Sequence, residues 1–69
     1  MPKYHVEHYP ENGDWYFTNG DGFRGNRSKP KKVICEDYYF WEFNVEQENL
    51  VEAVRYAEQK IKDFLKAND

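Results

Sequence analysis

The sequence predicts a small α+β domain in which an antiparallel sheet is followed by one long C-terminal helix. Up to residue 44, β-branched and aromatic residues alternate with turn-forming residues, which is typical of strands. From residue 45 onward, apolar residues recur at helical spacing. The chain has 69 residues and 19% aromatic residues, a content that favours a folded core over disorder. We therefore expect a single domain over residues 1–69, with the sheet in residues 3–44 and the helix in residues 45–66.

Residues 4–9 and 15–18 are expected to form an antiparallel hairpin. Both runs combine aromatic and β-branched residues, and an Asn-Gly pair lies between them, which is a strong hairpin signal. Because side chains alternate along a strand, Trp15 and Phe17 share one face and Tyr16 lies on the other. Trp15 and Phe17 are the better candidates for the core.

Residues 33–44 form the next extended segment. Its odd positions carry the better set of core candidates, which are Val33, Cys35, Asp37, Tyr39, Trp41 and Phe43. Asp37 is the one polar residue in this set, and a bend at Glu36 and Asp37 would remove the conflict. The segment is therefore either one bent strand or two short ones. We favour a sheet of three strands, with four strands as the alternative.

The C-terminal segment has the pattern of an amphipathic helix. Its apolar residues follow one another at intervals of three, four or one, and they are Leu50, Val54, Ala57, Ile61, Phe64 and Leu65. Asn44 and Gln47 resemble a capping box in which Asn replaces Ser or Thr. The predicted helix therefore begins near residue 45 and packs across a single face of the sheet.

Charge is distributed unevenly along the chain. The net charge is -3, yet the predicted loop of residues 19–32 contains a basic segment, formed by Arg24, Arg27, Lys29, Lys31 and Lys32. One interpretation is a solvated loop that its like charges keep soluble. The other is a nucleic-acid-binding loop that contacts phosphates, with stacking by Tyr38 and Phe40.

A single helix leaves one face of the predicted sheet uncovered. Parity places Tyr38 and Phe40 on that face, and Tyr16 joins them. Exposed rings of this kind anchor protein partners, while shielding by the long loop or burial in a homodimer would also account for them. The carboxylates of Glu36 and Glu42 lie close in sequence to the rings. We therefore expect a face that binds another protein through Tyr16, Tyr38, Phe40, Glu36 and Glu42.

Several function classes are not expected. The single cysteine, Cys35, excludes an intramolecular disulfide, and neither a signal peptide nor an apolar run long enough for a membrane span is present. The expected location is cytoplasmic. His5 and His8 are three residues apart in a strand, so they point to opposite faces and cannot readily share a metal ion. With no catalytic motif in the sequence, we expect neither an enzyme nor a bound cofactor or metal.

The order of sheet and helix, with the segments of residues 52–57 and 61–65, resembles the β-β-β-α unit of HicB-type antitoxins. Similar units occur in the arm-binding domains of phage integrases and in YegP-like proteins. The antitoxin resemblance implies protein binding, and the integrase resemblance implies DNA binding by the sheet. The small size and acidic charge favour a non-enzymatic inhibitor or antitoxin of the kind that phages and mobile elements carry. A nucleic-acid-binding protein is the alternative.

Overall fold

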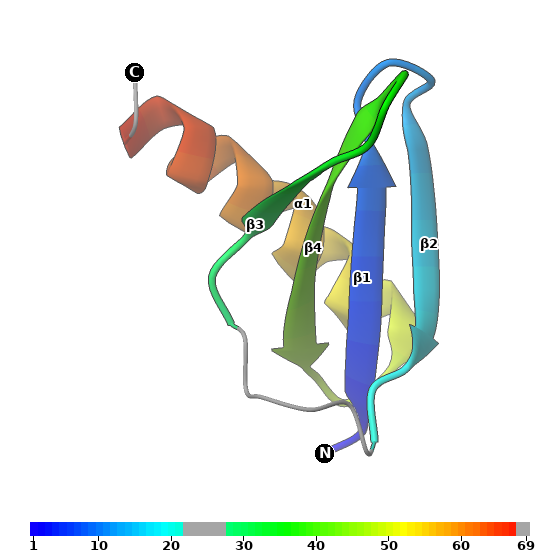
Figure 1. The fold of residues 1–69 in the computed structure, drawn as a ribbon. Coiled ribbons are helices and arrows are strands. Elements are labelled where there is room, and N and C mark those ends of the chain that lie inside the picture. Colours follow the sequence, from blue (N-terminus) through cyan, green and yellow to red (C-terminus); the bar gives the residue numbers. More distant parts are fainter. Residues whose placement is uncertain (22–27, 68–69) are drawn as a thin grey trace.

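The computed structural model describes residues 1–21 and 28–67 and contains one sheet and one helix (Figure 1). The strands are β1 (Lys3–Tyr9), β2 (Asp14–Asn19), β3 (Lys31–Ile34) and β4 (Tyr39–Glu46), and the helix is α1 (Leu50–Ala67). The sheet is antiparallel, with the strand order β2-β1-β4-β3. The α+β class is confirmed, and the sheet has four strands.

Strand β1 lies inside the sheet and pairs on both sides, so that Val6 is opposite Phe17 of β2 and Phe43 of β4. The β1–β2 turn closes where the sequence predicts it. Gly13 has a φ of 73°, which glycine adopts without steric cost, and its N–H donates to the carbonyl of Tyr9 over 2.9 Å. A few residues further on, a Cβ on Gly20 would lie 3.0–3.1 Å from the β1 backbone, which is tighter than most Cβ contacts, so the close approach there favours glycine.

Residues 35–38 form a tight turn between β3 and β4, in which the Cys35 N–H donates to the Tyr38 carbonyl over 2.8 Å. The segment of residues 33–44 is therefore two strands. The odd-numbered core pattern holds at Trp41 and Phe43 and is wrong before them, since Tyr39 is not among the residues that pack in the core. Val33 pairs with Phe40 and shares the face opposite the helix, while the exposed Asp37 lies in the turn.

The helix begins at Leu50, five residues later than predicted. β4 continues to Glu46 because it pairs with β1 along that whole length, with Lys3 opposite Glu46. The capping residue is Asn49, whose Oδ1 accepts a hydrogen bond from the N–H of Glu52 over 3.0 Å. The capping box predicted at Asn44 and Gln47 is therefore wrong, since Asn44 lies within β4.

The core lies between α1 and the face of the sheet that carries Val6. Small helix residues allow close packing of α1 against the sheet, and the buried apolar residues of the two layers are Val6, Phe43, Val45, Ala53, Ala57 and Ile61. At the C-terminal end of the helix, Phe64 contacts the Trp41 ring edge to face, with 5.5 Å between ring centroids. Trp15 and Phe17 pack against this core, as predicted.

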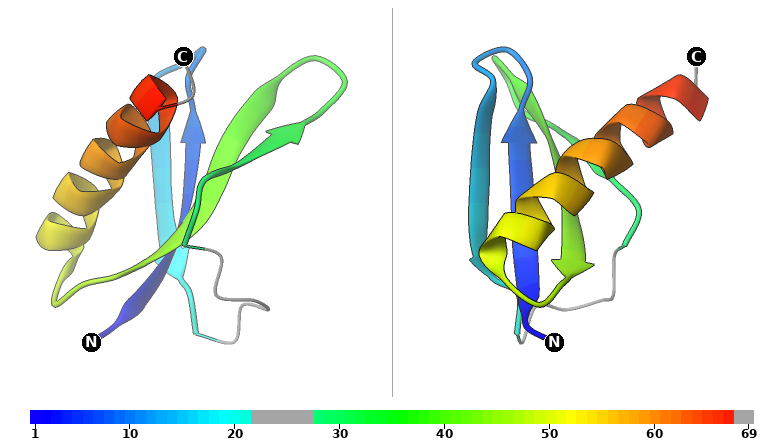
Figure 2. Two further views of the ribbon diagram at one scale, coloured as in Figure 1. Left: turned by 90° about the vertical axis from the view of Figure 1, so that its left-hand side faces the viewer. Right: turned by 180° about the vertical axis from the view of Figure 1, so that it is seen from behind.

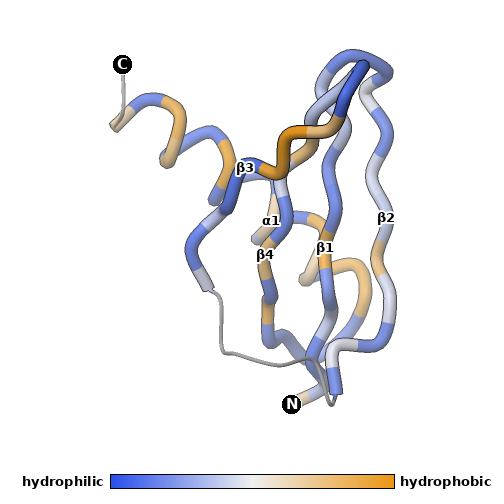
Figure 3. Tube along the Cα trace, viewed as in Figure 1, coloured by the Kyte–Doolittle hydropathy of each residue, from blue (hydrophilic) through white to orange (hydrophobic). Residues whose placement is uncertain are grey.

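The helix crosses the sheet obliquely, so its two ends extend beyond the core (Figure 2). Leu50 and Leu65 are exposed, which corrects their predicted place in the core. The β3–β4 hairpin curves away from α1, and Ile34 on its helix side stays 76% exposed (Figure 2). Figure 3 marks this end of β3 as hydrophobic. Among residues 1–21 and 28–67, no helix combines the length and apolar character that crossing a membrane requires.

Candidate functional site

The face of the sheet opposite α1 carries the polar and aromatic side chains that the core excludes. We call it the open face. Strand alternation and register place on it one set of residues from the three strands β1, β2 and β4, which is His5, Glu7, Tyr9, Tyr16, Thr18, Phe40, Glu42 and Asn44. Aromatic rings gather at one end of this face, near the two hairpin turns, and a histidine with carboxylates lies next to them.

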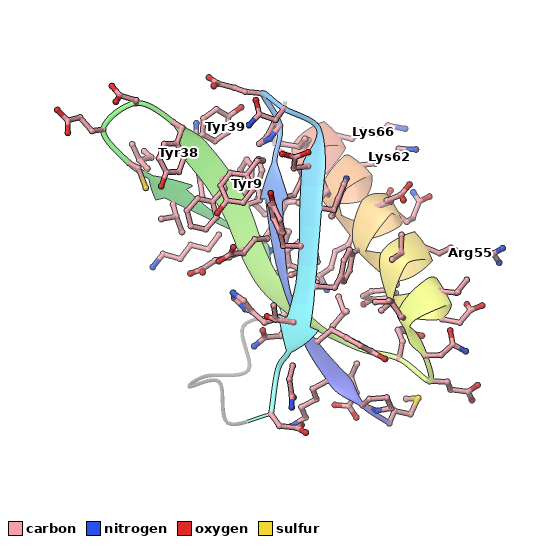
Figure 4. All side chains as sticks on the ribbon, turned by 90° about the vertical axis from the view of Figure 1, so that its right-hand side faces the viewer. Tyr9, Tyr38, Tyr39, Arg55, Lys62 and Lys66 are labelled. Carbon is pink, nitrogen blue, oxygen red and sulfur yellow. The ribbon has the colours of Figure 1, made fainter. Side chains whose placement is uncertain are left out.

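The aromatic cluster is formed by Tyr9, Tyr16, Tyr38 and Phe40. Tyr9 is at its centre: its ring stacks on Phe40 at 4.8 Å between centroids and meets Tyr16 edge to face at 5.5 Å. Tyr38 lies 6.1 Å from Tyr9 and 6.3 Å from Phe40. Figure 4 shows Tyr9 and Tyr38 side by side on the open face, away from the helix.

All three tyrosines of this cluster line a pocket of about 460 Å³, which we call the tyrosine pocket. Its wall combines four tyrosines with three carboxylates and one amide, and the lining residues are Glu7, Tyr9, Glu11, Asn12, Asp14, Tyr16, Tyr38 and Tyr39. None of these lining residues is a lysine, arginine or histidine. The pocket therefore presents aromatic faces and negative charge to the solvent.

Two phenols of the pocket have raised pKa values. The pKa of Tyr9 is raised from 10.0, first by desolvation, then by the negative charge of Glu7 and by the hydrogen bond that its hydroxyl donates to Glu7 Oε1 over 3.2 Å. The pKa of Tyr38 is also raised, chiefly by a hydrogen bond with the side chain of Cys35. Both phenols therefore keep their protons to higher pH than an isolated tyrosine.

A second group on the open face, the His5 cluster, consists of His5, Glu7, Glu42 and Asn44. His5 is only 7% exposed, and its Nδ1 lies 3.1 Å from Asn44 Oδ1. On the other side of the ring, Nε2 lies 3.6 Å from Glu7 Oε2 and 3.7 Å from Glu42 Oε2. The ligand atoms of the histidine and the two glutamates all lie within 4.8 Å of one another, close enough for one metal ion.

The residues predicted for protein binding lie at three places. Tyr16 and Tyr38 are on the open face, 51% and 47% exposed, while Phe40 is half-buried beneath the stacked rings. Glu42 belongs to the His5 cluster. Glu36 is exposed in the turn between β3 and β4 and does not line the pocket.

The predicted basic segment is described only in part. Arg24 and Arg27 lie outside the described residues, and Lys29 is exposed. Lys31 and Lys32 belong to β3 and not to a loop, so their side chains leave opposite faces of the sheet. Lys31 pairs with Glu42, while the Nζ of Lys32 lies 4.5 Å from the centre of the Tyr39 ring. These two lysines do not form one basic surface.

Sequence reasoning missed several residues of both groups. Tyr9, Glu11 and Asp14 belong to the β1–β2 hairpin, and they meet Tyr38 and Tyr39 only because the turn of the β3–β4 hairpin lies beside it. His5 meets Asn44 across 39 residues of sequence, a contact that no local pattern signals. The opposite orientation of the two histidines was predicted correctly: His8 stacks on Trp15 on the helix side, with 3.9 Å between ring centroids.

No protein-family model matches the sequence, and neither the curated proteins nor the solved structures yielded a match. The resemblance to antitoxin, integrase and YegP-like units thus depends only on the order of sheet and helix and on the helical segments of residues 52–57 and 61–65. The function has to be argued from the open face itself.

Proposed function

We propose that the domain is a protein-binding module whose tyrosine pocket receives a lysine or arginine side chain from a basic protein partner. The observation that carries this proposal is the lining of the pocket, where four tyrosines stand beside the carboxylates of Glu7, Glu11 and Asp14. A cation is attracted by the face of an aromatic ring and by a carboxylate at the same time. A phosphate or an acidic peptide would be repelled by the same groups.

The molecule already contains one cation on a tyrosine of this pocket. Lys32 places its Nζ 4.5 Å from the centre of the Tyr39 ring, within the range of a cation–π interaction. Arginine suits such a pocket further, because its planar guanidinium stacks on rings and donates paired hydrogen bonds to carboxylates. The partner is therefore expected to present arginine as its main anchor.

A protein fits the surroundings of the pocket better than a small molecule does. Tyr16 and Tyr38 extend the aromatic surface beyond the pocket and are each about half exposed. Tyrosine is enriched among the residues that dominate binding energy in protein interfaces. An acidic domain that covers a basic surface of its partner in this way would act as an inhibitor or antitoxin without catalysis of its own.

The nucleic-acid alternative gains little from the described part of the basic segment. Lys31 and Lys32 diverge across β3, and the carboxylates on the open face oppose phosphates. A second copy of this chain is another conceivable occupant, since Arg55, Lys62 and Lys66 project from the far side of the molecule (Figure 4). The test below distinguishes both of these, a nucleic acid and a second copy of the chain, from a basic protein partner.

The test measures binding of an eight-residue arginine peptide to the full chain by calorimetry at 50 and 200 mM salt. We expect 1:1 binding that weakens with salt, because opposite charges are screened. Replacing Tyr16 and Tyr38 together by Ala should weaken it at least tenfold. The matched control is Tyr56→Ala, which removes an exposed tyrosine from the helix and should leave the affinity unchanged.

A charge reversal completes the test. Glu11→Lys combined with Asp14→Lys should abolish peptide binding, while Glu58→Lys on the helix should change it little. Equal losses in the pocket variants and the helix controls would contradict the proposal. Tight binding of a single-stranded oligonucleotide without peptide binding would favour the nucleic-acid alternative, and a dimer in sedimentation at micromolar concentration that Glu11→Lys with Asp14→Lys dissociates would favour a second copy.

A further inference from the structure

We propose that His5, Glu7 and Glu42 form a binding site for a divalent transition-metal ion of the zinc class. The three residues come from the two inner strands of the sheet. His5 and Glu7 are two residues apart on β1 and so share the open face, and Glu42 lies directly opposite Glu7 on β4. A metal site held by paired inner strands is rigid, which favours tight coordination.

Asn44 orients the histidine for metal binding. An amide oxygen only accepts hydrogen bonds, so the 3.1 Å contact between His5 Nδ1 and Asn44 Oδ1 places a hydrogen on Nδ1. In the neutral ring, Nε2 then carries its lone pair toward the two glutamates. Metal-ligating histidines commonly have this arrangement, in which the nitrogen that does not bind the metal donates to an oxygen of the protein.

The distances match a tetrahedral ion. Zinc lies about 2.0–2.2 Å from histidine nitrogen and carboxylate oxygen, so two ligand atoms of a tetrahedron are about 3.4 Å apart. Nε2 lies 3.6 Å from Glu7 Oε2 and 3.7 Å from Glu42 Oε2. Both distances exceed the tetrahedral value by a few tenths of an ångström, and all three ligand atoms lie within 4.8 Å of one another, so the side chains would close in around one ion. Three protein ligands leave a fourth position for water.

The ligand set favours zinc over harder cations. A neutral imidazole with two carboxylates balances a charge of +2, and imidazole nitrogen prefers zinc, copper or nickel to magnesium. Among the divalent first-row metals, such a site binds zinc more tightly than manganese. Since His5 is 7% exposed, the ligand nitrogen also lies away from bulk water, which strengthens its interaction with the ion.

The competing occupant is a proton. A second proton on His5 would make the ring an imidazolium and would hold both glutamates by ion pairs, with no metal. The two states differ in what Nε2 carries. In the metal state Nε2 is bound to the ion, and in the proton state both ring nitrogens carry hydrogen.

The experiment titrates the full chain, without an affinity tag and freed of metal by chelation, with zinc chloride in a calorimeter at neutral pH. We expect one ion per chain, weaker binding of manganese and no measurable binding of magnesium. Glu42→Gln should weaken zinc binding at least tenfold. Asn44→Leu, which removes the carboxamide that contacts Nδ1 and keeps all three ligands, should weaken it about tenfold or more. Glu58→Gln on the helix is the matched control and should change nothing.

Nitrogen NMR of the His5 ring in the wild-type protein gives a readout that does not depend on a variant that folds. Zinc should shift the Nε2 resonance while Nδ1 keeps its hydrogen. The proposal is overturned if the ring is doubly protonated and insensitive to zinc, or if Glu42→Gln and Glu58→Gln bind zinc as tightly as the wild type. Because no peptide ligand enters this experiment, its outcome is independent of the pocket proposed for a basic partner.

Discussion

The two faces of the sheet are built from the same strands and have opposite chemistry. On β1, Val6 is fully buried among apolar side chains under the helix, whereas His5 and Glu7 on either side of it face each other across the open face. On β4, Phe43 is fully buried while Glu42 and Asn44 contact His5. Along one strand, successive residues thus alternate between packing in the core and making polar contacts on the open face.

This separation teaches that the two faces should respond differently to substitution. The covered face excludes water and contains the apolar area that stabilises the fold. The open face holds carboxylates and phenols whose hydrogen bonds and charges are partly solvated, so single changes there should cost little free energy of unfolding. Binding of a partner should show the reverse dependence: substitutions on the open face should weaken it most.

The largest effect is expected from Ile61→Asp. Ile61 is buried against the sheet, so a carboxylate there would be left without a partner in the core, at a cost of about 4 kcal/mol or more. A domain of this size rarely has more than about 3–5 kcal/mol to lose. We expect the variant to lose its cooperative unfolding transition in circular dichroism, whereas Lys62→Asp on the exposed side should keep it. Similar losses in both would show that the helix packs on a different face.

A second comparison uses the β3–β4 hairpin, which supplies aromatic residues to both sides of the sheet. Phe43→Ala should cost about 3–5 kcal/mol in urea unfolding, because Phe43 is fully buried and its removal leaves a cavity. Tyr38→Ala should cost less than about 1 kcal/mol, since its ring is 47% exposed. If Tyr38→Ala were as destabilising as Phe43→Ala, the open face would be part of the core.

The smallest effect concerns alkaline pH. Because Tyr9 has a raised pKa in the folded protein, the fold binds its proton more tightly than the unfolded chain does. The corresponding stabilisation is complete below pH 10 and is lost as pH rises through the raised pKa. Urea unfolding measured from pH 8 to 11 should therefore show a steeper loss of stability above pH 10 in the wild type than in Tyr9→Phe. Parallel curves would contradict a raised pKa of Tyr9 in the folded protein.

The sequence predicts well whatever depends on alternation within one segment. Parity correctly placed Trp15 and Phe17 on the helix side and Tyr16 opposite them, and the spacing of Ala57 and Ile61 gave the buried side of the helix. Turn residues also located the first hairpin. These features need only neighbours in sequence, so local patterns contain them.

Features that depend on distant strands were missed. The helix start was predicted too early because Asn44 and Gln47 match a local capping pattern, yet pairing with β1 keeps that segment extended. The turn between β3 and β4 contains neither glycine nor proline, so nothing marked it strongly. The metal-ligand geometry of His5 and Glu42 arises from the register of β1 against β4, which the sequence alone does not reveal.

The position of β1 inside the sheet has a consequence for how the chain folds during synthesis. Its first partner, β2, follows at once, but its second partner, β4, is made only after residue 39 has left the ribosome. Until then the β1–β2 hairpin has neither an inner neighbour nor a helix over Val6, and an isolated hairpin is marginally stable in water. We therefore expect these residues to stay unstructured until β4 and α1 have both emerged from the ribosome. They should then fold in one cooperative step, and closure of the long loop between β1 and β4 should limit its rate.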